Sequence, residues 1–154
     1  MKTLILGLGN PILTDDGVGV RVARLLAEHL SDEPDVTVAE ASVGGLRLLE
    51  IVANYDRLIL VDAIQTIGGQ PGEIHRLTPD AFCASLHSGC SHDVDLVTAL
   101  ELGRKLGMSM PKEIVIIAIG AEDVVTFGER CTARVEAAIP QAVKAVWEEL
   151  RALR

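Results

Sequence analysis

The apolar run at residues 58–63 (Leu-Ile-Leu-Val-Asp-Ala) constrains the fold of this chain more than any other segment. Its first four residues are all apolar, whereas a strand with one face in water alternates apolar and polar residues. Such a run is typical of an internal strand of a parallel sheet with helices on both faces. The runs at residues 2–8 and 113–119 are also short and apolar, and the first ends at a Gly-Asn-Pro turn. We therefore predict a parallel sheet built on these three strands.

Helical patterns separate the predicted strands. Apolar residues recur at helical spacing in four segments, and the predicted helices are 18–30, 46–55, 92–106 and 132–153, with one more helical turn at 79–83. Pro140 either kinks the last helix or lies in its first turns. Residues 36–41 and 73–77 are predicted to be further strands, and the second is short and polar, so we expect an antiparallel edge strand there.

Alternation of strands and helices implies right-handed crossovers between parallel strands. The predicted fold class is therefore α/β, with residues 1–154 forming a single domain. Its architecture is a three-layer sandwich around a mostly parallel, twisted sheet of about five strands. Because 49% of the residues are hydrophobic but only 3% are aromatic, we expect an aliphatic core.

Charge and composition exclude several classes of protein. The net charge of −8 repels nucleic-acid phosphates, so we expect no nucleic-acid partner. No apolar run approaches the roughly 20 residues of a membrane helix, and the first run is too short for a signal peptide. We therefore expect a cytoplasmic protein with no membrane partner. The three cysteines include no Cys-x-x-Cys pair, which argues against a disulfide framework and against a thiolate zinc site.

Three chemically reactive residues follow predicted strands or open a predicted helix. Asp16 comes after the first strand, Asp62 ends the third, and His92 opens a helix. In a parallel sheet these side chains gather beyond the carboxyl ends of the strands, where open α/β sheets bind ligands. Two carboxylates and one imidazole suit a divalent metal with open coordination positions.

Each of these residues also has a structural interpretation. Asp15 or Asp16 could cap the first helix, Asp62 could be a turn residue, and His92 could lie on the surface. We expect Asp15 to be the cap and Asp16 to face the cleft, although the reverse assignment is possible.

A dinucleotide site is an alternative interpretation of the first turn. Gly7-Leu8-Gly9 begins a glycine fingerprint, and Glu40 ends the second strand where a ribose-binding acid would lie. The fingerprint requires a third glycine at the position of Ile12 and a helix that starts at once. Here the predicted helix is delayed, which disfavours this alternative.

The segment at residues 7–19, Gly-Leu-Gly-Asn-Pro-Ile-Leu-Thr-Asp-Asp-Gly-Val-Gly, resembles the N-terminal signature of the hydrogenase maturation endopeptidases. Residues 59–63 resemble the strand of that family that ends in Asp-Ala, and residues 91–96 resemble its histidine segment. The similarity of layout covers nearly the whole chain. The chain departs from the family at Glu40, where relatives often carry Asp.

The resemblance implies a nickel-dependent endopeptidase that removes a C-terminal peptide from the precursor of a hydrogenase large subunit. It implies that Asp16, Asp62 and His92 contact nickel already inserted in that precursor, with zinc or cadmium as possible surrogates. We also expect Asp16 to act in catalysis and Asn10 and Glu40 to bind substrate. The rival interpretation from another class is a nickel-binding or chaperone module without peptidase activity.

Overall fold

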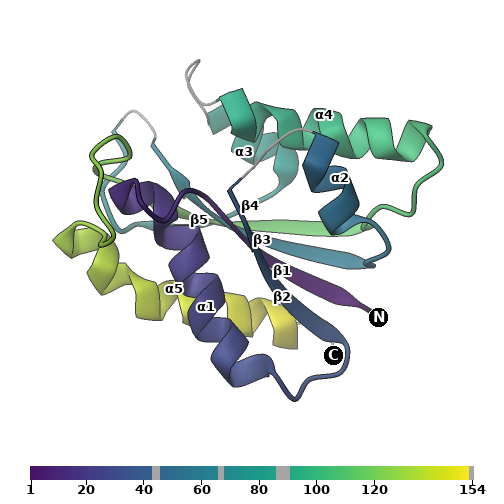
Figure 1. The fold of residues 1–154 in the computed structure, drawn as a ribbon, viewed down its shortest axis with the longest axis horizontal. Coiled ribbons are helices and arrows are strands. Elements are labelled where there is room, and N and C mark those ends of the chain that lie inside the picture. Colours follow the sequence, from purple (N-terminus) through teal and green to yellow (C-terminus); the bar gives the residue numbers. More distant parts are fainter. Residues whose placement is uncertain (43–45, 66–67, 86–90, 153–154) are drawn as a thin grey trace.

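A computed structural model describes residues 1–42, 46–65, 68–85 and 91–152 of the chain; the side chains of residues 46, 85 and 91–95 also lie outside the described part. Five strands form one sheet in the order β2-β1-β3-β5-β4 (Figure 1). The first four strands of this order pair in parallel, and β4 pairs with β5 in the antiparallel direction. The strands are β1 (Thr3–Leu8), β2 (Val36–Ala41), β3 (Arg57–Ile64), β4 (Ile74–Leu77) and β5 (Glu113–Gly120).

Helices cover both faces of the sheet, which makes three layers (Figure 1). Two helices pack on one face: α1 (Val18–Leu30) and α5 (Ala133–Arg151). Three helices pack on the other: α2 (Leu46–Val52), α3 (Pro79–Ser85) and α4 (Ser91–Lys105). The predicted fold class is confirmed: this is a single-domain α/β sandwich with a mostly parallel five-stranded sheet and one antiparallel edge strand.

The uninterrupted apolar strand β3 lies in the middle of the sheet, between β1 and β5. Leu58 and Leu60 face the core under α2, α3 and α4, whereas Ile59 and Val61 face the core under α1 and α5. Both sets are buried, which is why this strand does not alternate apolar and polar residues.

Most element ends lie within one or two residues of the prediction, and α2 and α3 differ in ways that the structure explains. The predicted helix 46–55 ends at Val52, because Asn54 takes a left-handed conformation (φ 71°) and its N–H donates to the Ser109 carbonyl. The predicted turn at 79–83 is a helix, α3, that continues to Ser85. Pro140 lies inside α5, where the helix continues without interruption, and its ring is on the exposed side.

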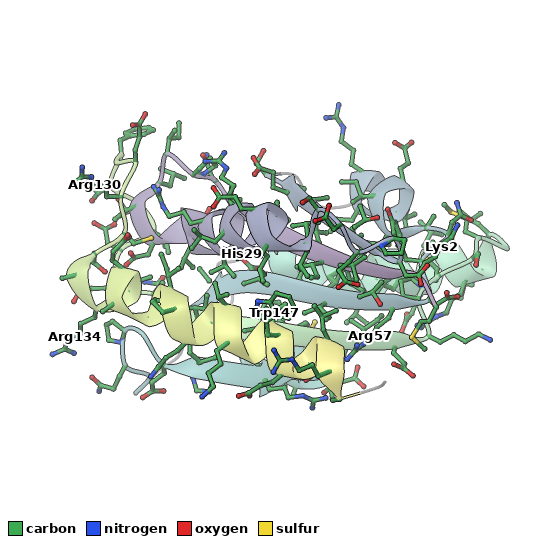
Figure 2. The ribbon with its side chains drawn as sticks, turned by 90° about the horizontal axis from the view of Figure 1, so that it is seen from below. Lys2, His29, Arg57, Arg130, Arg134 and Trp147 are labelled. Carbon is green, nitrogen blue, oxygen red and sulfur yellow. The ribbon has the colours of Figure 1, made fainter. Side chains whose placement is uncertain are left out.

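A partly buried ionic cluster lies at the end of the sheet where β3 begins. Arg57 is almost fully buried, and its guanidinium donates to the carboxylate of Glu149 on α5 (3.2 Å). Arg76 donates two further hydrogen bonds to that carboxylate, at 2.6 and 2.8 Å. Arg57 lies toward one end of α5 and Arg134 toward the other (Figure 2).

None of the helices in the described ranges is both long enough and apolar enough to cross a membrane.

Candidate functional site

Glycines bring the segment after β1 close to the end of β3. Gly9 has φ 142°, and a Cβ atom there would lie 1.9 Å from the carbonyl oxygen of Asp16. A Cβ atom on Gly19, in the first turn of α1, would lie 2.2 Å from the carbonyl oxygen of Val61. Only residues without a side chain permit both approaches. The 3-10 turn η1 (Thr14–Gly17), which carries Asp16, therefore packs against β3 just before Asp62.

These contacts bear on the dinucleotide alternative. A ligand's pyrophosphate would need to approach the backbone at the glycine turn. At Gly9 the chain's own backbone, at Asp16 and Gly17, already occupies the space beside the turn. The glycine spacing is therefore explained by packing within the chain.

The carboxylate of Asp16 is partly exposed beside the first turn. One of its oxygens, Oδ2, accepts a hydrogen bond from the backbone N–H of Asn10 at 2.9 Å. The side chain of Asn10 accepts from the N–H of Ile12 at 3.2 Å, so its amide oxygen serves its own turn. This geometry leaves Asp16 at the carboxyl end of β1, as the sequence predicts.

Asp62 lies near the end of β3 and is buried. Its Oδ1 accepts from the N–H of Ala63 at 2.8 Å. Asp62 is in register with Ala118 of β5, and Ala118 is in register with His75 of β4. Residues in register across a sheet have side chains on the same face, here the face of α3 and α4. His75 therefore lies on the same face as Asp62, two strands away from it. Its Nε2 lies 3.2 Å from a carboxylate oxygen of Glu73.

The third predicted metal ligand, His92, lies in the first turn of α4, but its side chain is outside the described part of the structure. Since α4 covers the same face of the sheet as Asp62, the backbone of His92 belongs to the correct layer. Among the side chains that are described, no group of three His, Cys, Asp or Glu residues could hold a metal ion. The three-residue metal site thus stays a prediction.

Asp15 has a different role from the predicted helix cap. The residue at the N-cap of α1 is Gly17, with no side-chain capping bond. Asp15 is instead fully buried, and its Oδ1 accepts from the N–H of Thr132 at 2.7 Å. Its Oδ2 accepts from the N–H groups of Glu122 (2.9 Å) and Asp123 (3.0 Å) and from the hydroxyl of Thr132 (2.8 Å). Asp15 therefore fastens η1 to the loop between β5 and α5.

The backbone joins the same two segments. The N–H of Thr14 donates to the carbonyl of Gly128 at 3.0 Å, and the N–H of Gly128 donates to the carbonyl of Ile12 at 2.9 Å. The Thr14 hydroxyl donates to the carbonyl of Thr126. Cys131 is half-buried at this junction, and burial raises the pKa of its thiol to about 11. The thiol is protonated at neutral pH, so Cys131 is a poor nucleophile.

Glu40, at the end of β2, lies beside a cation of the same chain. Both of its carboxylate oxygens accept from the guanidinium of Arg24 on α1, each at 2.9 Å. These hydrogen bonds lower the pKa of Glu40 and raise that of Arg24. The pair is on the surface, so it holds the Glu40 side chain over α1 without making it inaccessible.

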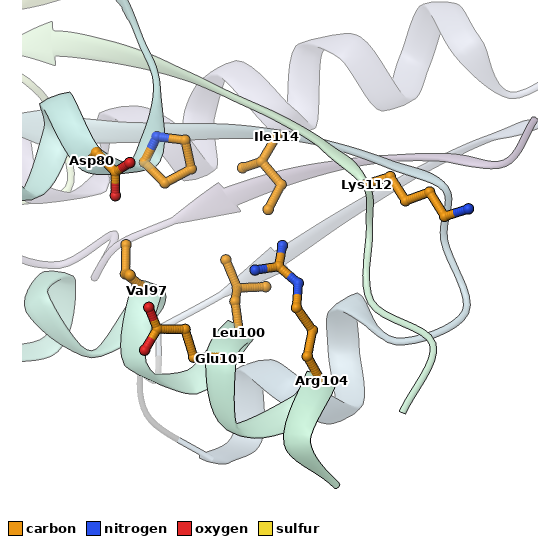
Figure 3. A pocket seen from close by; sticks show the side chains of 8 residues that line it. Asp80, Val97, Leu100, Glu101, Arg104, Lys112 and Ile114 are labelled. Carbon is orange, nitrogen blue, oxygen red and sulfur yellow. The ribbon is translucent and has the colours of Figure 1, made fainter. Parts of the chain in front are cut away.

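Two cavities in the described part of the chain lie toward opposite ends of the sheet. One cavity of about 350 Å³ lies between α3, α4 and the start of β5 (Figure 3). Its lining includes Leu100, Arg104 and Ile114, which belong to the end of α4 and the beginning of β5, away from the carboxyl ends of the parallel strands. A smaller pocket of about 110 Å³ lies beyond the ends of β3 and β5, where Ile64, His75 and Gly120 contribute to its lining. This smaller pocket lies at the same end of the sheet as Asp62.

Comparisons with known proteins identify one group of relatives. The family model described as hydrogenase maturation protease matches residues 20–149. The chain is similar to the hydrogenase 2 maturation protease of Escherichia coli (strain K12), with 31% identity over 98% of this chain and 92% of the relative.

Solved structures agree with these relatives. The hydrogenase maturating endopeptidase HybD from E. coli aligns with a TM-score of 0.82 at 30% identity, over 99% of this chain and 93% of that one. The [NiFe] hydrogenase maturation protease HybD from Thermococcus kodakarensis aligns with a TM-score of 0.72 at 25% identity, over 97% and 99% of the two chains.

Proposed function

Because this chain belongs to the hydrogenase maturation protease family, we propose that it cuts a C-terminal peptide from the precursor of a hydrogenase large subunit. The proposed cut depends on nickel that the precursor already carries. The observation that carries this proposal is that Asp16 and the buried Asp62 lie at the carboxyl ends of two neighbouring parallel strands, β1 and β3, in a chain that aligns with such proteases over almost its whole length.

The donor chemistry supports nickel as the metal that is recognised. Carboxylates and imidazole suit Ni²⁺ and Zn²⁺, and Asp16, Asp62 and His92 are the proposed contacts. Three protein ligands leave coordination positions for groups of the precursor itself. Zinc or cadmium is expected to occupy the same contacts as a surrogate.

The exposure of the two aspartates suggests a division of roles. Asp62 is buried and held by the N–H of Ala63, so it is suited to fixing the position of a cation. Asp16 is more accessible, and we propose that its carboxylate takes a proton from the attacking water, as a general base. The N–H of Asn10 orients Asp16 by its hydrogen bond.

Two further residues are proposed to contact the peptide. Asn10 lies in the turn that presents Asp16, so a peptide that reaches Asp16 passes beside it. Glu40 ends the neighbouring strand β2, and a cationic group of the peptide would compete with Arg24 for its carboxylate.

An intact-mass assay tests the proposal. The protein is incubated with a hydrogenase large-subunit precursor, either nickel-loaded or metal-free, and the mass of the precursor is followed with time. We expect a discrete loss of a C-terminal peptide from the nickel-loaded precursor alone. Variants Asp16→Ala, Asp62→Ala and His92→Ala should abolish this loss, while Asp32→Ala, at an exposed turn after α1, should not.

Two results would contradict the proposal. Unchanged processing by all three site variants would refute the site assignment. Stoichiometric nickel binding with no change in the mass of any precursor would favour the non-catalytic nickel-binding or chaperone module.

A further inference from the structure

Three large apolar side chains are exposed beside the candidate site. Phe127 is 79% exposed, Val125 is 78% exposed and Ile12 is 48% exposed. We call these three residues the apolar tip. Phe127 is one of only two phenylalanines in the chain, and the other, Phe82, is fully buried. Large apolar side chains are exposed together mainly where they contact a partner.

The apolar tip is held in place by the hydrogen bonds that join its two segments. Gly128, next to Phe127, exchanges backbone hydrogen bonds with Ile12 and Thr14. Within the loop, the N–H groups of Val125 and Thr126 both donate to the Asp123 carboxylate, at 3.0 and 2.9 Å. The four hydrogen bonds of Asp15 then fasten this loop to η1. The exposed side chains therefore stand on a braced backbone, which reduces the entropy lost when a partner binds.

The apolar tip and the candidate site share one segment of chain. Ile12 lies in the turn between Asn10 and Asp16, which are themselves hydrogen-bonded. The loop that carries Val125 and Phe127 lies at the end of the molecule where η1 lies (Figure 1). A protein large enough to present a peptide to Asp16 would therefore cover the apolar tip as well.

We infer that the apolar tip is the docking surface for the folded body of the protein substrate, with Phe127 inserted in an apolar depression of that substrate. This inference rests on the proposed function, because it takes the occupant to be the protein that the enzyme cuts. It adds a contact outside the metal site and the cleaved peptide.

Area and charge favour this occupant over two others. Three side chains of this kind expose about 300–400 Å², whereas a standard interface buries roughly 800 Å² per partner. The tip alone is therefore too small for a stable dimer of this chain, but it is adequate as one part of a contact that continues into the site. A lipid surface is disfavoured because three acidic residues of the loop, Glu122, Asp123 and Glu129, outnumber its one basic residue, Arg130, in a chain of net charge −8.

The experiment measures binding to the precursor, and the intact-mass assay follows cleavage by the same proteins. A nickel-loaded hydrogenase large-subunit precursor is immobilised, and the Kd is measured for the wild-type protein, Phe127→Ser and Val125→Ser. The matched control is Leu106→Ser, since Leu106 is also exposed (65%) but lies after α4, at the opposite end of the sheet. Circular dichroism and thermal melts verify that all four proteins are folded.

We expect the Kd to rise about tenfold or more for each tip variant and less than about twofold for the control, as for a central aromatic contact. Equal Kd values for wild type and both tip variants, or no binding of the precursor by wild type, would overturn the inference. A failure of the proposed function alone gives another result. The wild type would bind the precursor and the tip variants would bind it more weakly, as the inference expects, but no protein would shorten the precursor.

Discussion

The same substitution, Asp to Asn, should mainly lower the stability of the protein at Asp15 and mainly abolish processing of the precursor at the adjacent Asp16. Asp15→Asn retains the size of the side chain but replaces one acceptor oxygen by an NH₂ group. In either orientation the amide faces at least one donor, because both Asp15 oxygens accept hydrogen bonds from Thr132 and Oδ2 also accepts from Glu122 and Asp123. Asp16→Asn affects one hydrogen bond, that from Asn10, at a partly exposed site.

The structure sets the size of the difference. Loss of a charged acceptor costs about 1.5–3 kcal/mol, and a buried donor left without an acceptor adds about 1–3 kcal/mol. We therefore expect Asp15→Asn to lower the free energy of unfolding by about 3 kcal/mol. For a chain of this length that lowers the Tm by about 6–12 °C. Asp16→Asn should cost about 1 kcal/mol or less and yet abolish processing of the precursor.

Calorimetric melts and urea titrations measure the stability, and the intact-mass assay measures processing at a temperature where both variants are folded. Amide hydrogen exchange at Glu122 and Asp123 gives a local readout, since these N–H groups should lose protection in Asp15→Asn alone. The reasoning would be refuted if the two variants melted at the same temperature, or if exchange at Glu122 and Asp123 stayed at the wild-type rate in Asp15→Asn.

Two further predictions concern charge and packing. Glu149→Gln should destabilise the protein by about 2–4 kcal/mol at neutral pH. Hydrogen bonding to Arg76 lowers the pKa of Glu149 in the folded protein. The ionised carboxylate therefore stabilises the fold above the ordinary glutamate pKa, and this stabilisation is lost as the pH falls through the lowered pKa of the folded state. Urea titrations of the two proteins should therefore converge in acid, and a stability difference independent of pH would contradict this. Gly19→Ala should lower the free energy of unfolding by about 2 kcal/mol or more, since its Cβ would lie 2.2 Å from the Val61 carbonyl oxygen. The control is Ala27→Ser, an exposed change on the same helix. Equal melting temperatures for the two variants would show that α1 shifts without cost.

Much of the fold follows from periodicity, because burial on one face or two leaves a different pattern in each strand. The apolar run at residues 58–63 predicts an internal strand, and β3 is internal. The short polar run at residues 73–77 predicts an antiparallel edge strand, and β4 is that strand. The end of α2 was not predictable, since it depends on the contact of Asn54 with Ser109, 55 positions along the chain.

The candidate site was predictable where topology alone places a residue. Asp16 follows β1 and Asp62 lies near the end of β3, and neighbouring parallel strands end at one edge of the sheet. The role of Asp15 was mispredicted because helix capping is a local interaction, whereas its actual partners are 107 to 117 residues away. The pairing of Glu40 with Arg24 was missed for a similar reason, since it forms only when α1 lies over the β1–β2 pair.

The packing glycines also bring the start of a helix close to the site. Gly19 lets the first turn of α1 approach β3 beside Asp62, and Asp16 lies in the turn that leads into that helix. Free N–H groups at a helix N-terminus stabilise nearby anions, but only by about 0.3–1 kcal/mol each. That is too little to balance the charge of two carboxylates. On the proposed function, a divalent ion carried by the precursor would supply the larger share of positive charge, so binding should strengthen when the precursor is loaded with metal. A backbone that holds the carboxylates in position before the precursor binds would let the enzyme distinguish a nickel-loaded precursor from a metal-free one, because only the loaded precursor would bring the positive charge.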